Sequence, residues 1–131
     1  MRPLGYWIKE IDRRIEADLG RLLAEDGLTR RHWQVLHTIE QGPATRAGLD
    51  EALAPFADSV CPEVDDLIGR GWAAGAEPGS LTLTGPGRAA HDRIAQRVYA
   101  ARARVTDGLA EQEYVTLIGL LERVAGNLAP A

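Results

Sequence analysis

The side chains best suited to chemistry in this sequence are aromatic residues and histidines in its first 40 positions. Trp7, His32 and His37 offer flat aromatic faces and imidazole nitrogens, which suit a planar organic molecule with one hydrogen-bonding group. His32 and His37 are five residues apart, which is not the one-turn spacing of two metal ligands on a helix, so we expect no metal site. The sequence therefore predicts a small-molecule site whose candidate ligand-binding residues are Trp7, Ile11, His32, Trp33 and His37.

Two of the three tryptophans have a simpler interpretation than ligand binding. Trp33 and Trp72 are large apolar side chains, and we interpret both mainly as packing residues in the core of the domain. Trp7 is therefore the better tryptophan candidate for contact with a ligand, and Trp33 stays in the candidate set only as a wall of the same site.

Acidic residues near position 60 form the second group that could do chemistry. Glu63, Asp65 and Asp66 could act as a catalytic carboxylate pair, but a solvated acidic helix face is the simpler interpretation. The sequence has no catalytic triad motif, phosphate-binding loop or zinc-ligand cluster, so no motif supports an enzyme, and we expect no cofactor. Cys61 is the single cysteine and cannot form an internal disulfide, and its acidic neighbours argue against a redox sensor.

Charge is distributed unevenly along the chain. The 131 residues carry a formal net charge of −4, and residues 44–84 alone hold seven acidic and two basic side chains. No apolar stretch approaches the roughly 20 residues of a membrane span, and residues 1–16 lack the apolar block of a secretory signal. We therefore expect one soluble domain in the cytoplasm, without membrane contact, whose middle third is acidic.

The spacing of apolar residues predicts a mainly α-helical fold. Apolar side chains recur every three or four positions through residues 4–25, which is typical of a long amphipathic helix. Thr29 suits the N-cap of a second, shorter helix, which Gly42 and Pro43 end. Residues 44–53 are expected to form a third short helix.

A fourth helix is expected in the acidic segment that follows. Asp58 or Ser59 can cap its start, because both side chains can accept a hydrogen bond from a backbone N–H of the first turn. Val60, Val64, Leu67 and Ile68 are expected to face the core, which leaves the acidic side chains of this helix on the outside.

A hairpin and two more helices complete the predicted fold. Residues 72–76 and the alternating residues 81–84 are typical of two short strands, joined by a tight turn at residues 77–80. Residues 85–87 are expected to lead into a long helix with apolar side chains from Ala90 to Val105 on one face, and a final helix lies between residues 108 and 128.

The first and last helices carry more apolar surface than a monomer of this size needs. A second copy of the chain, related by a two-fold axis, would bury that surface. We therefore predict a homodimer whose interface includes Leu4, Ile8, Leu117, Leu121, Val124 and Leu128.

Several short runs along the chain resemble, in order and spacing, the MarR family of winged helix-turn-helix transcription regulators. They are GLTRRHWQVL from residue 27, GPAT from residue 42, LIGRGW from residue 67, LTLTGPGR from residue 81 and LLER from residue 120. The resemblance covers nearly all of residues 1–131. It implies a single MarR-like domain in which residues 1–27 and 86–131 form dimerisation helices and residues 28–85 form the winged helix-turn-helix lobe.

The resemblance also implies a function. A homodimeric regulator of this kind places its fourth helix in the DNA major groove and its hairpin wing near a minor groove, and small phenolic or other aromatic ligands adjust the spacing of the two lobes. The partners implied are therefore a second copy of the chain, double-stranded DNA and a small aromatic ligand.

The sequence departs from the family pattern in both DNA-contacting elements. The fourth helix carries Glu63, Asp65 and Asp66, whereas family members commonly have serine, threonine and arginine around residues 58–63. Residues 73–80 of the hairpin contain no arginine or lysine, so the wing lacks a cation for a minor groove. The candidates that remain for contact with DNA are Arg30, Arg31, Arg46, Ser59 and Arg70.

These departures leave three hypotheses. The first is a ligand-responsive DNA-binding regulator. The second is a MarR-like protein that has lost DNA binding and works as a small-molecule binding protein or a repurposed enzyme through the cleft between lobe and dimerisation helices. The third is a protein-interaction module whose acidic face docks a basic partner.

Overall fold

The computed structural model describes residues 1–55, 57–76 and 79–130. These residues form six helices and one two-stranded antiparallel sheet, which confirms the predicted mainly α-helical class with a short hairpin. None of the helices among the described residues is long and apolar enough to span a membrane. In chain order the elements are α1 (Leu4–Ala24), α2 (Arg30–Glu40), α3 (Arg46–Leu53), α4 (Cys61–Gly69), β1 (Ala73–Ala76), β2 (Ser80–Leu83), α5 (Gly85–Val105) and α6 (Glu111–Asn127).

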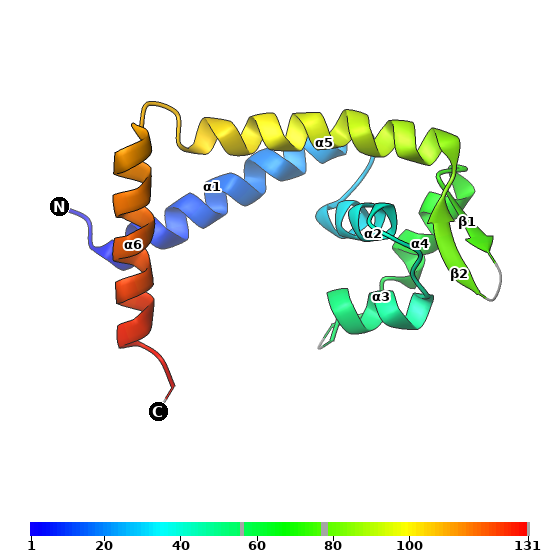
Figure 1. Cartoon of the computed structure of the whole chain (residues 1–131), viewed down its shortest axis with the longest axis horizontal. Coiled ribbons are helices and arrows are strands. Elements are labelled where there is room, and N and C mark those ends of the chain that lie inside the picture. Colours follow the sequence, from blue (N-terminus) through cyan, green and yellow to red (C-terminus); the bar gives the residue numbers. More distant parts are fainter. Residues whose placement is uncertain (56, 77–78, 131) are drawn as a thin grey trace.

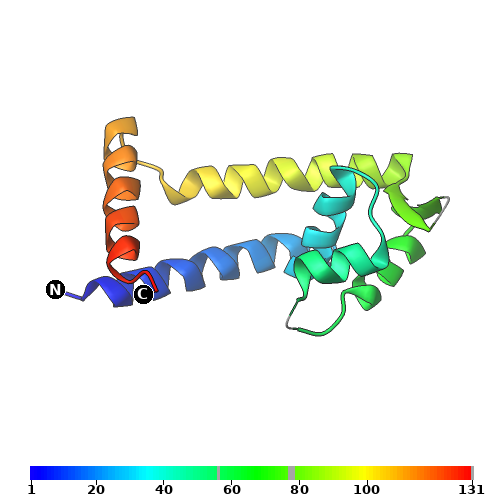
Figure 2. The ribbon, with the colours of Figure 1, turned by 60° about the horizontal axis from the view of Figure 1, so that its bottom comes forward.

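The molecule has a small lobe at one end of two long helices. Helices α1 and α5 run beside each other, and α6 crosses their far end, close to both chain termini (Figures 1 and 2). Helices α2, α3 and α4 and the hairpin gather at the other end (Figure 1). Arginines of α5 hold the two long helices together, because Arg93 and Arg97 donate hydrogen bonds of 3.0 and 3.1 Å to the carboxylate of Asp26, just after α1.

The hydrophobic core lies within the lobe and under the adjoining half of α5. Val64 and Leu67 of α4 are fully buried there, as predicted, but Ile68 is 36% exposed. The prediction for Ile68 was wrong because only one narrow face of this short helix is covered. The largest fully buried side chains are Leu23, Val35, Leu36, Leu49, Val60, Val64, Leu67, Ile94 and Val98.

Threonine caps fix where three of the helices begin. The hydroxyl oxygens of Thr29, Thr45 and Thr84 each accept a hydrogen bond from a backbone N–H three residues further on, at the starts of α2, α3 and α5. The predicted start of α3 at residue 44 was wrong by two positions. Ala44 instead exchanges two backbone hydrogen bonds with Leu81, at 2.7 and 3.1 Å, which ties the loop before α3 to the wing.

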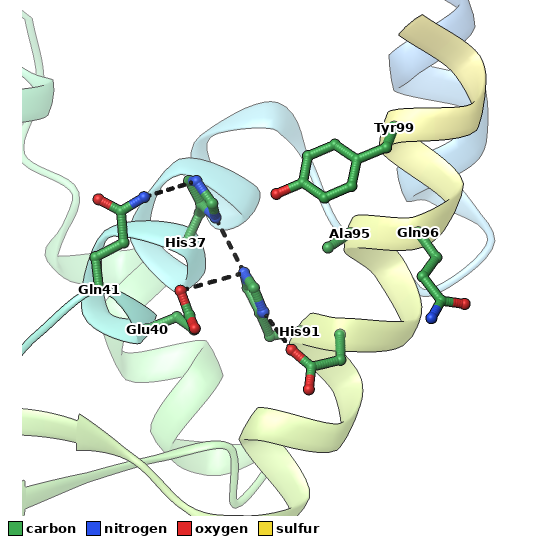
Figure 3. Close-up of a pocket in the computed structure, with 8 residues that line it drawn as sticks. His37, Glu40, Gln41, His91, Ala95, Gln96 and Tyr99 are labelled. Atoms are coloured by element: carbon green, nitrogen blue, oxygen red, sulfur yellow. Dashed lines mark hydrogen bonds and ion pairs between the residues drawn. The ribbon is translucent and has the colours of Figure 1, made fainter. Parts of the chain in front are cut away.

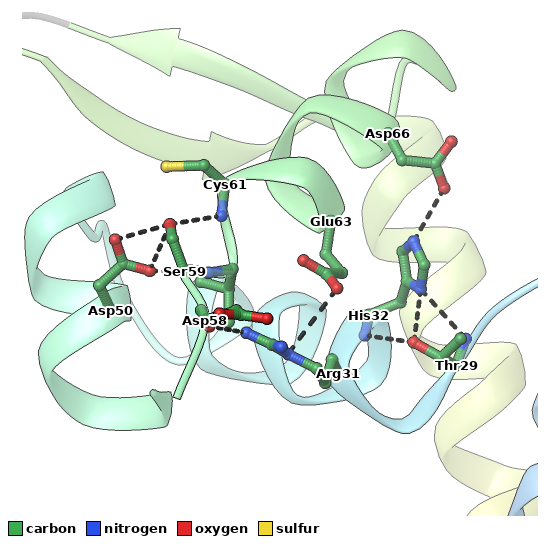
Figure 4. Close-up of polar contacts among 10 residues, drawn as sticks. Thr29, Arg31, His32, Asp50, Asp58, Ser59, Cys61, Glu63 and Asp66 are labelled. Carbon is green, nitrogen blue, oxygen red and sulfur yellow. Dashed lines mark hydrogen bonds and ion pairs between the residues drawn. The ribbon is translucent and has the colours of Figure 1, made fainter. Parts of the chain in front are cut away.

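The start of α4 is held by a neighbouring helix rather than by its own cap. Neither Asp58 nor Ser59 is the N-cap; that residue is Val60, which has no side-chain cap bond. The carboxylate of Asp50, on α3, accepts the Val60 N–H at 2.8 Å, and the Ser59 hydroxyl oxygen accepts the Cys61 N–H at 3.0 Å (Figure 4). The first backbone donors of α4 are therefore satisfied partly from α3, which fixes the two helices relative to each other.

The strands of the wing differ by one residue from their predicted bounds: β1 begins one residue later and ends as predicted, and β2 lies one residue earlier. Ala73 pairs with Leu83 and Ala76 with Ser80, so Trp72 and Thr84 lie outside the ladder. Of the predicted turn at residues 77–80, the first two positions lie outside the described residues. The wing runs directly into α5, where Gly87 is buried against the backbone of Trp72.

Candidate functional site

The exposed surface of α4 is acidic, as its sequence indicates. Asp65 and Asp66 are exposed and Glu63 is half-buried. This helix would have to approach the DNA phosphates in a winged-helix complex, and carboxylates there repel the phosphates. The arrangement of the nearby arginines therefore decides what charge this surface presents.

Two arginines that were candidates for DNA contact pair with α4 itself. The Arg46 guanidinium of α3 lies 2.7 Å from the carboxylate of Asp65. Arg31 of α2 lies 3.7 Å from the carboxylate of Glu63 and also donates a hydrogen bond to the backbone carbonyl of Asp58 (Figure 4). Both arginines are at the lobe surface, but each is already neutralised by an acid of the helix that it would assist.

The other two candidate arginines are paired as well. Arg30 lies 2.6 Å from the carboxylate of Glu16, on α1. Arg70 lies 3.1 Å from Asp66 and donates hydrogen bonds to the backbone carbonyls of Asp26 and Gly27, at 2.7 and 3.1 Å. Arg70 thus links the end of α4 to the loop after α1, in addition to any contact it makes outside the protein.

The remaining candidates on this side also have partners within the lobe. The Ser59 hydroxyl donates to the carboxylate of Asp50 at 2.9 Å. His32 closes the capping box of α2, since its Nδ1 accepts the Thr29 N–H at 3.1 Å, and its Nε2 lies 3.1 Å from the carboxylate of Asp66 (Figure 4). His32 therefore lies on the side of the lobe that carries α4.

A second polar cluster lies between α2 and α5. His37 Nδ1 is 3.0 Å from His91 Nε2, and the side-chain nitrogen of Gln41 is 3.0 Å from His37 Nε2. On the other side, His91 Nδ1 is 3.0 Å from the carboxylate of Asp92. The carboxylate of Glu40 is 4.0 Å from His91 Nε2, so two acids and two imidazoles meet at one place (Figure 3).

The hydrogen bonds of this cluster are consistent with one assignment of protons. Since the Asp92 carboxylate can only accept, His91 Nδ1–H donates to it; with a neutral His91 ring, Nε2 then accepts from His37 Nδ1–H. His37 Nε2 in turn accepts from the Gln41 amide. The pKa of His37 is lowered, first by burial and further by the neighbouring His91, which favours the neutral form of His37.

An open depression lies over this cluster. Of the five residues predicted to bind a ligand, only His37 lines it, and Trp33 lies buried beside it with its ring centroid 5.2 Å from that of His37. Trp7 and Ile11 lie exposed on α1 and do not line the depression, and neither does His32. The lining residues are His37, Glu40, Gln41, His91, Asp92, Ala95, Gln96 and Tyr99.

The sequence interpretation missed His91, although it contains a signal for it. His91 is only 4% exposed and follows Ala90 on the face of α5 that also carries Ile94 and Val98. A histidine within the buried stripe of a predicted helix needs hydrogen-bond partners, so it indicates a polar contact with a neighbouring element. Which element supplies the partner depends on the tertiary fold.

Comparisons with known proteins give matches among solved structures. No protein-family model matches the sequence, and no curated protein matches it. MarR from E. coli in its reduced form is 25% identical, with a TM-score of 0.73 over 95% of this chain and 94% of that one. A MarR-family protein of Mycobacterium tuberculosis, solved in complex with DNA, is 26% identical, with a TM-score of 0.75 over 95% and 98% of the two chains. The same mycobacterial protein in complex with p-aminosalicylic acid gives a TM-score of 0.69 over 95% and 99%.

This chain has a MarR-like winged-helix fold. The structural likeness confirms the resemblance drawn from the sequence motifs. Within the MarR-like fold, α3 and α4 form the helix-turn-helix, and β1 and β2 form the wing. The acidic surface described above therefore lies on the helix that the resemblance assigns to the major groove.

The MarR-like fold leaves two apolar faces uncovered at the end away from the lobe. On α1, Leu4 and Ile8 are 49% and 46% exposed. Helix α6 has no buried residue at all; Leu117 and Leu121 are 42% and 36% exposed. Of the two other predicted interface residues, Val124 is half-buried and Leu128 is exposed.

Proposed function

We propose that the protein is a homodimeric transcription regulator that binds double-stranded DNA through α4 and the wing. The observation that carries this proposal is the likeness, over 95% of the chain, to a MarR-family protein solved in complex with DNA. The likeness includes the helix-turn-helix and the wing, which are the elements that such a protein applies to the grooves. A regulator of this kind would be located in the cytoplasm, where it can bind DNA.

The dimer is supported by the uncovered apolar faces of α1 and α6. Side chains such as Leu4, Ile8 and Leu117 are each more than two-fifths exposed in the single chain. Leaving several leucine and isoleucine side chains in water is unfavourable by roughly 1.5–3 kcal/mol for each one that could be fully buried. A two-fold partner that packs residues 1–27 and 86–131 against the same segments of a second copy removes this penalty.

Binding to DNA would require the lobe arginines to exchange partners. Arg31 and Arg46 pair with acids of α4, so each phosphate contact would leave Glu63 or Asp65 without a cation. The net gain in binding free energy for each phosphate contact is therefore smaller than for an unpaired arginine. We expect weak binding to DNA whose affinity falls steeply as salt is added.

The test is the binding of untagged protein to the DNA upstream of its own gene, followed by fluorescence anisotropy between about 50 mM and about 200 mM salt. A matched duplex of shuffled sequence is the control. We expect saturable binding that is tighter for the upstream DNA and that weakens with salt. Equal binding to both duplexes, or none at the lowest salt, would contradict the proposal.

The acidic surface of α4 favours a second candidate function. All four arginines of residues 28–85 are paired with carboxylates, and each of these ion pairs except Arg30 with Glu16 involves an acid of α4. A MarR-like protein that has lost DNA binding, and acts through its α2–α5 cluster, would account for this arrangement. The same anisotropy experiment separates the two candidates. A small aromatic ligand is proposed for either candidate and is supported by the likeness to the mycobacterial protein solved with p-aminosalicylic acid; of the five predicted ligand residues, His37 lines the depression between α2 and α5.

A further inference from the structure

Three side chains with metal-binding atoms meet between α2 and α5. One ligand atom from each of His37, Glu40 and His91 lies within 4.8 Å of the other two. We propose that His37, Glu40 and His91 form a binding site for a divalent transition-metal ion, for which zinc is the best match. This inference goes beyond the proposed function and does not depend on whether the protein binds DNA.

The backbone positions of the three residues allow their side chains to bind one metal ion together. His37 and Glu40 are three residues apart on α2, so their side chains project from the same face of the helix. His91 approaches from α5, on the opposite side of the depression (Figure 3). Ligands from two rigid helices can hold an ion with a defined geometry, as in helix-bundle metal sites.

The distances need only small changes to accept zinc. Two nitrogen ligands at about 2.0–2.1 Å from a tetrahedral zinc are about 3.3–3.4 Å apart. His37 Nδ1 and His91 Nε2 are 3.0 Å apart, so they would separate by a few tenths of an ångström. The Glu40 oxygen, 4.0 Å from His91 Nε2, would move closer by about 0.6–0.7 Å.

The hydrogen bonds around the cluster prepare His91 as a ligand. Its Nδ1–H donates to the Asp92 carboxylate, which leaves Nε2 free to face His37 Nδ1, 3.0 Å away. A carboxylate that accepts the other N–H of a metal-binding histidine is a common outer partner of zinc ligands. His91 is only 4% exposed, so its ring is already held in place by the fold.

His37 would bind through a change of tautomer. In the hydrogen-bonded arrangement its proton is on Nδ1; metal binding at Nδ1 requires that proton on Nε2 instead. The Gln41 side chain would then rotate its amide by half a turn and accept the Nε2–H with its oxygen. The proton moves from Nδ1 to Nε2 of the same ring, so His37 gains no net proton and loses none.

The ligand set matches zinc better than magnesium or calcium. Two imidazoles and one carboxylate are borderline ligands that zinc prefers, whereas magnesium and calcium favour oxygen ligands alone. The three residues would leave one tetrahedral position for water, which can reach the site because the depression is open to solvent. The alternative is that His37 and His91 only satisfy each other's hydrogen bonds.

The experiment is a titration of untagged full-length protein, stripped with a chelator, with Co²⁺ as a spectroscopic probe and Zn²⁺ as its competitor. We expect one Co²⁺ per chain, with the visible absorption of a tetrahedral site, and its displacement by Zn²⁺. His37→Gln and His91→Gln should each weaken binding by at least about 100-fold, and Glu40→Gln by about tenfold.

The third histidine of the chain supplies the matched control. His32→Gln makes the same chemical change outside the cluster and keeps a residue suited to the capping box. Its titration should coincide with that of the unaltered protein. Because His91 is buried, its substitution can disturb folding. The variant of the half-buried His37 therefore decides the test, and circular dichroism checks its fold. Absence of Co²⁺ binding, or binding unchanged in His37→Gln, would overturn the proposal.

Discussion

The guanidinium of Arg46 and the carboxylate of Asp65 lie 2.7 Å apart, so an ion pair joins α3 to α4 across the helix-turn-helix. Both side chains are substantially exposed, at 42% and 66%. Exposed pairs of this kind contribute only about 0–1 kcal/mol to folding. The pair therefore matters less for stability than for the charge that α4 presents to a partner.

Removing the Asp65 charge should strengthen binding to DNA. Asp65→Asn frees Arg46 for a phosphate and removes one repulsive carboxylate from α4. We expect about threefold tighter binding at low salt, and a plot of log affinity against log salt that is steeper by about 0.9. Fluorescence anisotropy with the same duplex over a range of salt concentrations measures both quantities.

The control for this prediction is Asp107→Asn. Asp107 is exposed in the loop between α5 and α6, so the substitution changes the net charge equally but far from α4 along the chain. If Asp107→Asn increases binding as much as Asp65→Asn does, the effect comes from net charge alone. The Arg46–Asp65 pair would then have no specific role.

Local chemistry was sufficient to predict most of the fold but not the partners of its polar residues. Thr29 was predicted as a cap from the residues beside it, and the structure confirms this. His37 and His91, in contrast, are 54 residues apart, and their contact exists only because α2 packs on α5. The pairing of Arg46 with Asp65 likewise depends on the angle between α3 and α4, which no local pattern specifies.

A charge within the apolar face of α6 should abolish the proposed dimer. Leu121→Glu would place a carboxylate in the interface, where its desolvation is unfavourable by several kcal/mol. We expect the protein to sediment as a monomer at micromolar concentration, with its helical content unchanged. Sedimentation velocity measures the first property and circular dichroism the second.

Ala52→Glu is the comparison for the dimer prediction. Ala52 is exposed on α3, within the lobe, and is outside the predicted interface. This variant should sediment as the unaltered protein does. A monomer in both variants, or a dimer in both, would mean that α6 does not form the interface.

Gly87 at the start of α5 should tolerate no side chain. A Cβ added there would lie 1.9 Å from the backbone carbonyl oxygen of Trp72, so either the wing or α5 would have to move. Gly87→Ala should lower the free energy of unfolding by about 3 kcal/mol, at the upper end of overpacking effects. Urea unfolding at fixed protein concentration measures the change.

The same glycine-to-alanine substitution at Gly20 should have the opposite effect on stability. Gly20 lies within α1 and a Cβ there meets nothing within 4 Å. Because alanine favours a helix over glycine by about 0.8–1.0 kcal/mol, this variant should be slightly more stable than the unaltered protein. If Gly87→Ala lowers the stability no more than Gly20→Ala does, contact with Trp72 is not the cause at Gly87.

Arg70 should contribute more to folding than Arg30, although both were predicted to contact DNA. Arg70 donates to the backbone carbonyls of Asp26 and Gly27 and pairs with Asp66, whereas Arg30 has one exposed partner, Glu16. Since hydrogen bonds from charged donors contribute about 1.5–3 kcal/mol, Arg70→Ala should lower the free energy of unfolding by about 2 kcal/mol. Arg30→Ala should lower it by less than about 1 kcal/mol. Equal losses of unfolding free energy in the two variants would mean that Arg70 does not stabilise the position of α4.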